Sequence, residues 1–202
     1  MFAYCNNCPV KYVDSSGSYC REAAVDYAEE WADSQNEEYY YYTNGDCANF
    51  VSQCLRAGGL SDNSEWYHHG RTKKKWYEII FDPLSWIQEK RRYNWSSSDA
   101  WRLANEQYLY FSNPENGYIN GEVIIISSAD GISSVANNGG VQPGDLLYFS
   151  RDGITAHHAT IITKVENGMI FFGAHTSPQF DCPLSEKIGS ETIFIIRIDN
   201  DA

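Results

Sequence analysis

Positive charge and long apolar runs are both scarce in this sequence. The 202 residues include 15 Lys and Arg against 27 Asp and Glu, a formal net charge of −12 at pH 7. Such an acidic protein lacks the excess of positive charge that binds a phosphate backbone, so we expect no nucleic-acid partner. No apolar run approaches the roughly 18 residues that a membrane span needs, so no membrane span is expected either. We interpret the one basic run, at residues 71–75, as a solvated loop.

Targeting signals, repeats and low-complexity linkers are also missing. The first five residues lack the basic-then-apolar pattern of a secretory signal, so no export by that route is expected unless this is a mature or trimmed form. A composition of 43% apolar and 15% aromatic residues excludes a disordered or fibrous chain. The length suits one domain, which we place at residues 18–202 after an N-terminal extension at residues 1–17.

The six cysteines do not form an obvious set. If Cys47 is a free nucleophile, five remain, an odd number that cannot all pair within one chain. Cys5 and Cys8 have the spacing of half a zinc site, which only Cys20 and the histidines could complete. An N-terminal disulfide or reduced thiols are the alternatives that we favour over zinc, and we expect no metal and no cofactor.

The pattern of apolar residues predicts helices first and strands later. Helices are expected from a Ser18 cap to about Asp33, after Asp46 up to Gly58-Gly59, and from a cap at Ser96–Asp99 to about Ser112. A polar loop should cover residues 61–75, with an extended piece at 76–81. Strands are expected at 122–126, 144–149, 158–165, 169–174 and 192–198, and Asn167-Gly168 predicts a hairpin. The expected fold is α+β, with N-terminal helices packed on a mainly antiparallel C-terminal sheet.

The start of the second helix is the best candidate for a reactive site. Cys47 follows a polar loop and precedes apolar residues at helical spacing. The first N–H groups of a helix have no intrahelical partner, and with the macrodipole they stabilise an anion there. Cys47 is therefore the candidate nucleophile, with its thiolate favoured over its thiol. The preceding tyrosine-rich loop, which includes Tyr42, is expected to line the adjoining surface.

A thiolate nucleophile needs a base, and that base needs an orienting partner. The predicted hairpin brings both to one end, because His157 and His158 open its first strand and His175 closes its second. Alternation places His158 on one face of the strand and His157 on the other. The residues alone leave the choice between these two histidines open.

Several of these segments together resemble a known family. The run Asp46-Cys47-Ala48-Asn49-Phe50-Val51-Ser52-Gln53, the strand at 144–149, the stretch His158–Thr163 and Ala174–Ser177 are similar to the bacterial putative amidase domain family. The resemblance implies a relation to the CHAP and NlpC-type cell-wall peptidases, and with it a papain-like fold. It covers roughly residues 18–198.

Carried over residue by residue, the resemblance implies that Cys47 is the nucleophile, His158 the general base and His175 the third polar residue. Asp46, Asn49, Tyr42 and His157 are then candidates for substrate or oxyanion contacts. The implied reaction is hydrolysis of an amide through a thioester on Cys47, with peptides of peptidoglycan as the substrate class.

Two other functions fit the same residues. An acyltransferase would send the thioester to an amine or alcohol instead of water. A papain-like binding module would use the exposed tyrosines and tryptophans to contact a glycan or a protein without catalysis.

Overall fold

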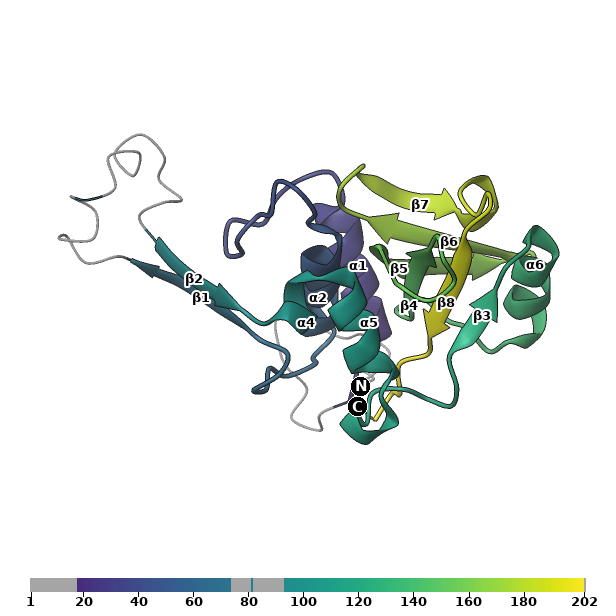
Figure 1. Ribbon diagram of the computed structural model, residues 1–202, viewed down its shortest axis with the longest axis horizontal. Helices are drawn as coiled ribbons and strands as arrows, with labels where there is room; N and C mark the ends of the chain where they lie inside the picture. The colour runs from purple at the N-terminus through teal and green to yellow at the C-terminus, as the bar shows by residue number, and fades with distance from the viewer. Residues whose placement is uncertain (1–17, 74–80, 82–92, 202) are drawn as a thin grey trace, which may run out of the picture.

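The computed structural model describes residues 18–73, 81 and 93–201. Its N-terminal half is helical, with α1 (Arg21–Trp31), α2 (Cys47–Ala57), α4 (Asp99–Arg102) and α5 (Ala104–Ser112). A two-stranded hairpin, β1 (His68–Lys73) and β2 (Tyr93–Ser97), extends away from these helices (Figure 1). Of the expected extended piece at 76–81, the structure describes residue 81 alone, which lies in a turn. The Asp82-Pro83 break and the N-terminal extension with Cys5 and Cys8 lie outside the described residues.

The C-terminal half is a six-stranded sheet in which every strand pairs antiparallel with its neighbours. Its order is β3-β8-β4-β5-β6-β7. A short 3-10 segment, η3, precedes β3 in the chain, helix α6 lies between β3 and β4, and a second 3-10 segment, η4, lies between β7 and β8. The bounds are η3 (Pro114–Asn116), β3 (Ile124–Ile126), α6 (Ala129–Asn138), β4 (Leu146–Ser150), β5 (His158–Glu166), β6 (Met169–Ala174), β7 (Gln179–Pro183), η4 (Leu184–Glu186) and β8 (Thr192–Ile196). The expected α+β architecture is therefore confirmed, including the hairpin that pairs β5 with β6.

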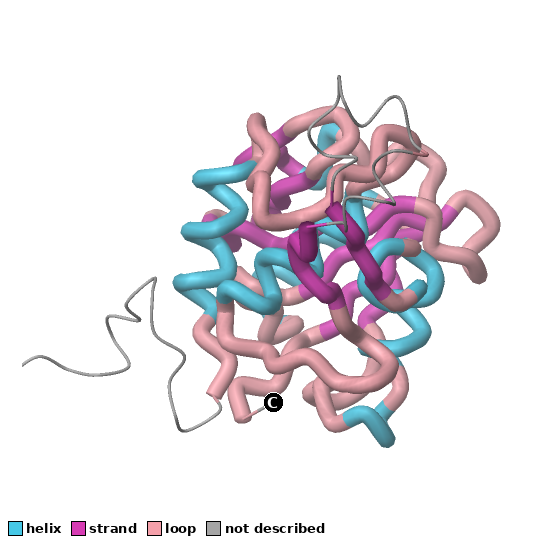
Figure 2. The backbone as a smooth tube through the Cα atoms, turned by 90° about the vertical axis from the view of Figure 1, so that its left-hand side faces the viewer, coloured by secondary structure: helices cyan, strands magenta, loops and turns pink. Residues whose placement is uncertain are grey.

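The two faces of the sheet build two separate cores. Tyr148, Ala159 and Ile161 belong to the cluster formed with α1, α2, α4 and α5. Phe149 and Ile162, their neighbours along the same strands, belong to the cluster beneath α6 and η4. This division follows from the alternation of side chains along a strand. The helices α1, α2 and α5 thus lie on one side of the sheet, and α6 lies on the other (Figures 1 and 2).

Three predictions of secondary structure need correction. Helix α1 begins at Arg21, not after a Ser18 cap, because the amides of Tyr19 and Cys20 donate to Asn200 and Gly58 carbonyls instead of entering the helix. The expected helix from Asp99 to Ser112 is broken at Leu103, whose backbone is extended (φ −112°, ψ 126°). The predicted loop at 61–75 contains β1. Strand β7 and helix α6 were not predicted.

A buried ion pair joins the two halves of the chain. Arg21 Nη1 lies 2.6 Å from Asp145 Oδ1, and its other guanidinium nitrogens donate to Asn200 and to the Ile198 carbonyl. Asp145, which is fully buried, also accepts from the backbone amides of Gln142 and Ile198. These bonds satisfy the carboxylate and hold the start of α1 against the loop before β4.

The two sides of α5 provide a test of this packing. Phe111 is fully buried and contacts the Trp66 ring (centroids 5.6 Å apart), whereas Leu109 on the same helix is 53% exposed. We expect Phe111→Ala to lower the free energy of unfolding by about 3–5 kcal/mol, because a buried aromatic ring leaves a cavity. Leu109→Ala is the matched control and should change it by less than about 1 kcal/mol. Urea denaturation followed by circular dichroism measures both, and similar losses for the two variants would contradict this placement of α5.

Candidate active site

Cys47 is the first residue of α2, as the sequence predicts, and it is nearly buried, with 7% of its surface exposed. Burial raises the pKa of its thiol, and hydrogen bonds from the backbone amides of Ala159 and Ala48 oppose that rise without cancelling it. The expected low-pKa thiolate is therefore not what the resting geometry favours. The helix N-terminus supplies amides to the sulfur, but desolvation outweighs them.

The start of β5 lies directly beside this cysteine. Ala159, whose amide points at the sulfur, is the residue after His158 and pairs with Tyr148 of β4. Ala159 and Tyr148 are fully buried in the same cluster as Cys47. The fold thus brings together the start of α2 and the start of β5, which are about 110 residues apart in the chain.

His158 is the first residue of β5, but its ring belongs to the other side of the sheet. It pairs with Phe149 in the register of β4 and β5, and the two ring centroids are 5.8 Å apart. Burial lowers the pKa of His158 to about 4, with the nearby His157 adding to the effect and Glu191 opposing it. The imidazole is therefore neutral at neutral pH.

His157 lies closer to solvent than its neighbour. Its Nε2 is 3.0 Å from Glu191 Oε2, and Arg151 approaches the other oxygen of the same carboxylate. No hydrogen bond within residues 18–73, 81 and 93–201 joins the Cys47 sulfur to a histidine ring. The structure therefore brings Cys47 to the backbone at this histidine pair without linking it to either ring.

Asp46, the residue before the cysteine, is the centre of a buried hydrogen-bond network. Its Oδ1 accepts from the Tyr42 amide (2.8 Å) and from Asn49 Nδ2 (2.9 Å). Its Oδ2 lies 2.6 Å from His175 Nδ1, and its own amide donates to Thr176 Oγ1. Asp46 is 1% exposed. Its carboxylate is therefore occupied by protein groups.

His175 directly follows β6 and contacts α2 from the sheet side. Its ring stacks on Phe50 with centroids 4.7 Å apart, and its Nε2 lies 2.7 Å from the Ser34 carbonyl oxygen. A carbonyl and a carboxylate can only accept, so both ring nitrogens carry protons and His175 is an imidazolium. Burial lowers its pKa, but the bonds to Asp46 and Ser34 and the Asp46 charge outweigh burial, and the pKa is raised above 6.5.

Asn49 and Tyr42 fix the tyrosine-rich loop. Asn49 is fully buried, and it donates to the Tyr40 carbonyl and accepts from Trp101 Nε1 at 2.7 Å. The hydroxyl of Tyr42 is 2.6 Å from Ser97 Oγ, which ties the loop to β2. As the structure places them, both residues hold the start of α2 through hydrogen bonds to protein groups.

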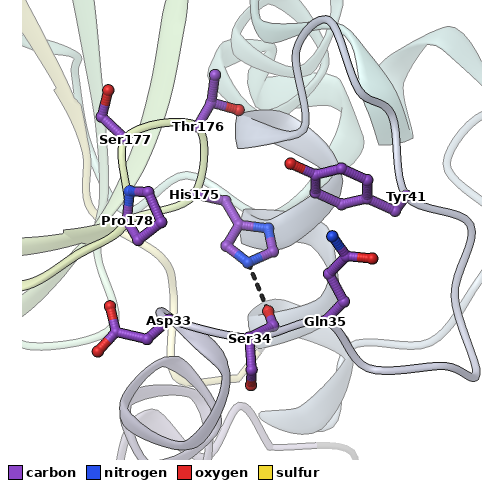
Figure 3. Close-up of a pocket in the computed structure, with 8 residues that line it drawn as sticks. All are labelled: Asp33, Ser34, Gln35, Tyr41, His175, Thr176, Ser177 and Pro178. Carbon is purple, nitrogen blue, oxygen red and sulfur yellow. Dashed lines mark hydrogen bonds between the residues drawn. The ribbon is translucent and has the colours of Figure 1, made fainter.

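A pocket of about 320 Å³ opens next to this network. His175 and Tyr41 line it together with Asp33, Ser34, Gln35, Thr176, Ser177 and Pro178 (Figure 3). Thr176 and Ser177 have positive φ angles of 61° and 76°, a left-handed turn that directs the chain around the pocket. Sequence reasoning missed Ser34 and Thr176, because a backbone carbonyl and a turn hydroxyl have no sequence pattern that reveals such roles.

The described cysteines other than Cys47 are Cys20, Cys54 and Cys182. Within the described part of the chain, no group of three or more His, Cys, Asp or Glu residues could hold a metal ion. Cys20 is disulfide-bonded, and Cys47, Cys54 and Cys182 are free thiols. No helix in the described ranges is long and apolar enough to cross a membrane.

Comparison with known proteins yields a family and two relatives. A family model described as a putative amidase domain matches residues 18–196. The uncharacterized protein YhbB of Bacillus subtilis is 28% identical over 160 residues, which are 78% of this chain and 42% of that protein. The uncharacterized protein YjcM of the same organism is 50% identical over 48 residues, 24% of this chain and 12% of that protein. The chain spans less than half the length of these curated relatives, and no solved structure matches it.

The charged His175 predicts a pH-dependent stability. Because its pKa is higher in the folded state than the unfolded value of about 6.5, its contribution is complete below pH 6.5 and is lost as the pH rises through the folded pKa. We expect His175→Gln to reduce the free energy of unfolding by about 1–3 kcal/mol at pH 5.5, and by less at pH 9. Urea denaturation over this pH range measures the difference.

His69→Gln serves as the control, because His69 is exposed and lies outside the network. It corrects for the general effect of replacing a histidine. A His175→Gln penalty that stays constant from pH 5 to pH 9 would show that the ring is not charged in the folded protein.

Proposed function

The chain belongs to the putative amidase domain family, and from that premise we propose that it hydrolyses amide bonds with Cys47 as the nucleophile. The observation that carries the proposal is the meeting of the Cys47 sulfur with the Ala159 amide, one residue after His158. A thiol at a helix N-terminus and a histidine at the start of the adjoining strand are the two groups that thiol-dependent acyl transfer uses, and the reaction requires the imidazole to come within hydrogen-bond reach of the sulfur.

In the proposed reaction, the Cys47 sulfur attacks the carbonyl carbon of the amide, and the thiol proton moves to a neutral imidazole. We assign that role to His158. Its ring packs against Phe149 in the structure and must rotate to reach the Cys47 sulfur. The tetrahedral oxyanion accepts hydrogen bonds from the amides in the first turn of α2. The imidazolium then protonates the leaving amine, and water hydrolyses the thioester to release the acid and restore the thiol.

His175 is assigned a positioning role in this scheme. Both of its nitrogens are engaged, with Asp46 and with Ser34, so it does not orient His158. It fixes Asp46, and through that residue the start of α2. Asp46, Asn49 and Tyr42 act in the same way, and His157 with Glu191 borders the position proposed for the base.

The proposed substrates are peptides, and peptidoglycan stem peptides are the class to test first. The support is the relation to cell-wall peptidases that we infer from the sequence resemblance of the Asp46–Gln53 run and the His158–Thr163 stretch to the putative amidase domain family. The pocket beside His175 offers hydroxyl, amide and carboxylate groups to a polar chain.

A non-catalytic binding module is the second candidate. It is favoured by the burial of Cys47 and by the raised pKa of its thiol, which both slow a nucleophile.

Replacing the proposed nucleophile separates these candidates. We expect Cys47→Ala to abolish release of peptide fragments from digested peptidoglycan, a loss of at least about 1,000-fold, because the variant lacks the sulfur that forms the thioester in the proposed reaction. Mass spectrometry of the muropeptides measures this. Cys182→Ser is the matched control, since Cys182 is a free and partly exposed thiol on β7, and it should keep full activity. Hydrolysis that survives in Cys47→Ala would eliminate the mechanism.

The pH profile tests the assigned base. His158 must be neutral to accept a proton, and burial lowers its pKa to about 4. We expect the acid limb of kcat/KM to fall near pH 4. His157→Gln removes a neighbouring ring that contributes to this lowering, so the limb should move to higher pH in that variant. An acid limb near pH 6.5 that does not move in His157→Gln would rule out His158 as positioned here.

A further inference from the structure

Three buried side-chain nitrogens within the described ranges have no hydrogen-bond partner, namely His68 Nδ1 on β1, Trp95 Nε1 on β2 and Arg197 Nε. The first two belong to neighbouring rings outside the proposed active site. His68 is 3% exposed. An unpaired buried donor costs free energy, so two such donors in adjacent rings indicate a site that an acceptor fills.

The protonation of His68 follows from its surroundings. The Tyr40 amide donates to its Nε2 at 3.4 Å, so that nitrogen carries the lone pair and Nδ1 carries the proton. Burial lowers the pKa of His68 to about 4, and the nearby Arg56 adds to the effect, so the ring is neutral at neutral pH. His68 Nδ1 is therefore an N–H donor, like the indole nitrogen of Trp95.

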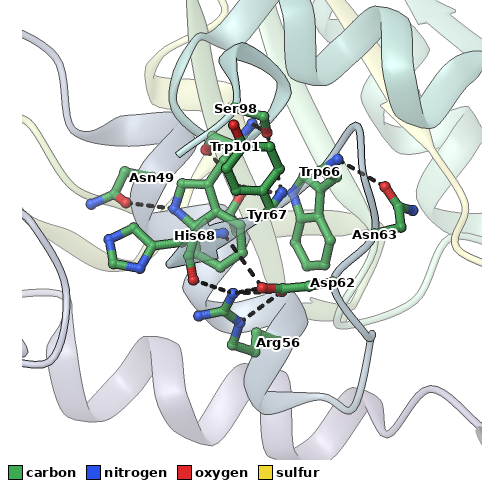
Figure 4. Close-up of polar contacts among 10 residues, drawn as sticks. Asn49, Arg56, Asp62, Asn63, Trp66, Tyr67, His68, Ser98 and Trp101 are labelled. Atoms are coloured by element: carbon green, nitrogen blue, oxygen red, sulfur yellow. Dashed lines mark hydrogen bonds and ion pairs between the residues drawn. The ribbon is translucent and has the colours of Figure 1, made fainter. Parts of the chain in front are cut away.

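The surrounding rings define what kind of group fits. The ring centroids of His68 and Trp95 are 5.7 Å apart. The Tyr39 ring lies 5.1 Å from His68, and the Tyr40 ring lies 6.0 Å from Trp95. The His68 imidazole points away from the pair formed by Arg56 and Asp62, which neutralise one another (Figure 4). Two N–H donors among aromatic faces, without a free charge, suit a neutral acceptor better than an anion.

We propose that His68 and Trp95 form a binding site for a neutral carbonyl group, such as that of an amide or an N-acyl substituent. The carbonyl oxygen has two lone pairs, one for each donor, and the planar amide stacks against the aromatic rings. Tyr40 is 39% exposed and its ring centroid lies 6.0 Å from that of Trp95, so the proposed ligand enters beside this ring. This site does not depend on the chemistry of Cys47.

The position of the site connects it with the start of α2. Tyr40 contributes its amide to His68 and its carbonyl to Asn49, and Asn49 bonds to Asp46. A ligand held between His68 and Trp95 is therefore bound by the same loop that leads to Cys47. This makes the site a recognition site for a remote amide or acyl group of a longer ligand.

The test is titration with N-methylacetamide, followed by the indole and imidazole N–H signals in nitrogen-15 NMR of the full chain. We expect a saturable shift of the Trp95 indole signal and of the His68 ring signals. The indole signals of Trp66 and Trp101 should stay in place, because they already donate to Ser52 Oγ and Asn49 Oδ1. The Cys47→Ala protein should respond identically, which separates this proposal from the proposed hydrolysis.

Trp95→Phe keeps the aromatic ring and removes the donor. It should weaken binding by about five-fold, the effect of one lost hydrogen bond, as read from the His68 signals. A response to acetate but not to N-methylacetamide would overturn the proposal in favour of an anion site. The absence of a saturable shift with either probe would overturn it as well, and would assign the two donors to internal water.

Discussion

The buried pair between Asp46 and His175 is the interaction on which the candidate site depends. Burying two charges is costly unless every donor and acceptor around them is satisfied. Here the Tyr42 amide and Asn49 complete the carboxylate, and the Ser34 carbonyl completes the imidazolium. The pair therefore connects the end of β6, the tyrosine-rich loop and the first turn of α2. Because Cys47 directly follows Asp46, the pair also fixes the position of Cys47 relative to the sheet.

Helix α2 is held from its other side by polar groups that are equally buried. Ser52 Oγ accepts from Trp66 Nε1 and Gln107 Nε2 and donates to the Trp101 carbonyl. Gln107 Nε2 also donates to the Ala48 carbonyl. All residues of α2 from Cys47 to Leu55 are buried, so their polar side chains must pair inside the protein. This explains why the run from Asp46 to Gln53 mixes apolar and polar residues without an exposed face, and it leaves α2 little freedom to shift.

The sequence predicts those elements whose signals are local. The five expected strands and the Asn167-Gly168 hairpin appear because β-branched runs and turn residues determine them. Helix α6 escapes prediction because its Gly, Ser, Asn and Asp residues have weak helix propensity, and packing on the sheet stabilises it instead. Of the site, the position of Cys47 was predictable, but its raised pKa was not, because burial comes from residues distant in the chain. The choice between His157 and His158 depends on sheet packing in the same way.

Burial favours the uncharged form of both the Cys47 thiol and the His158 imidazole. It raises the pKa of Cys47 and lowers that of His158, so a neutral thiol and a neutral ring are favoured over an ion pair. The amides at the start of α2 are then of little use to the resting thiol. They become effective when negative charge forms on a bound carbonyl oxygen, since the same low dielectric that disfavours the thiolate strengthens those hydrogen bonds. In the proposed reaction, burial therefore disfavours the thiolate before substrate binds. After substrate binds, the same buried amides stabilise the tetrahedral intermediate.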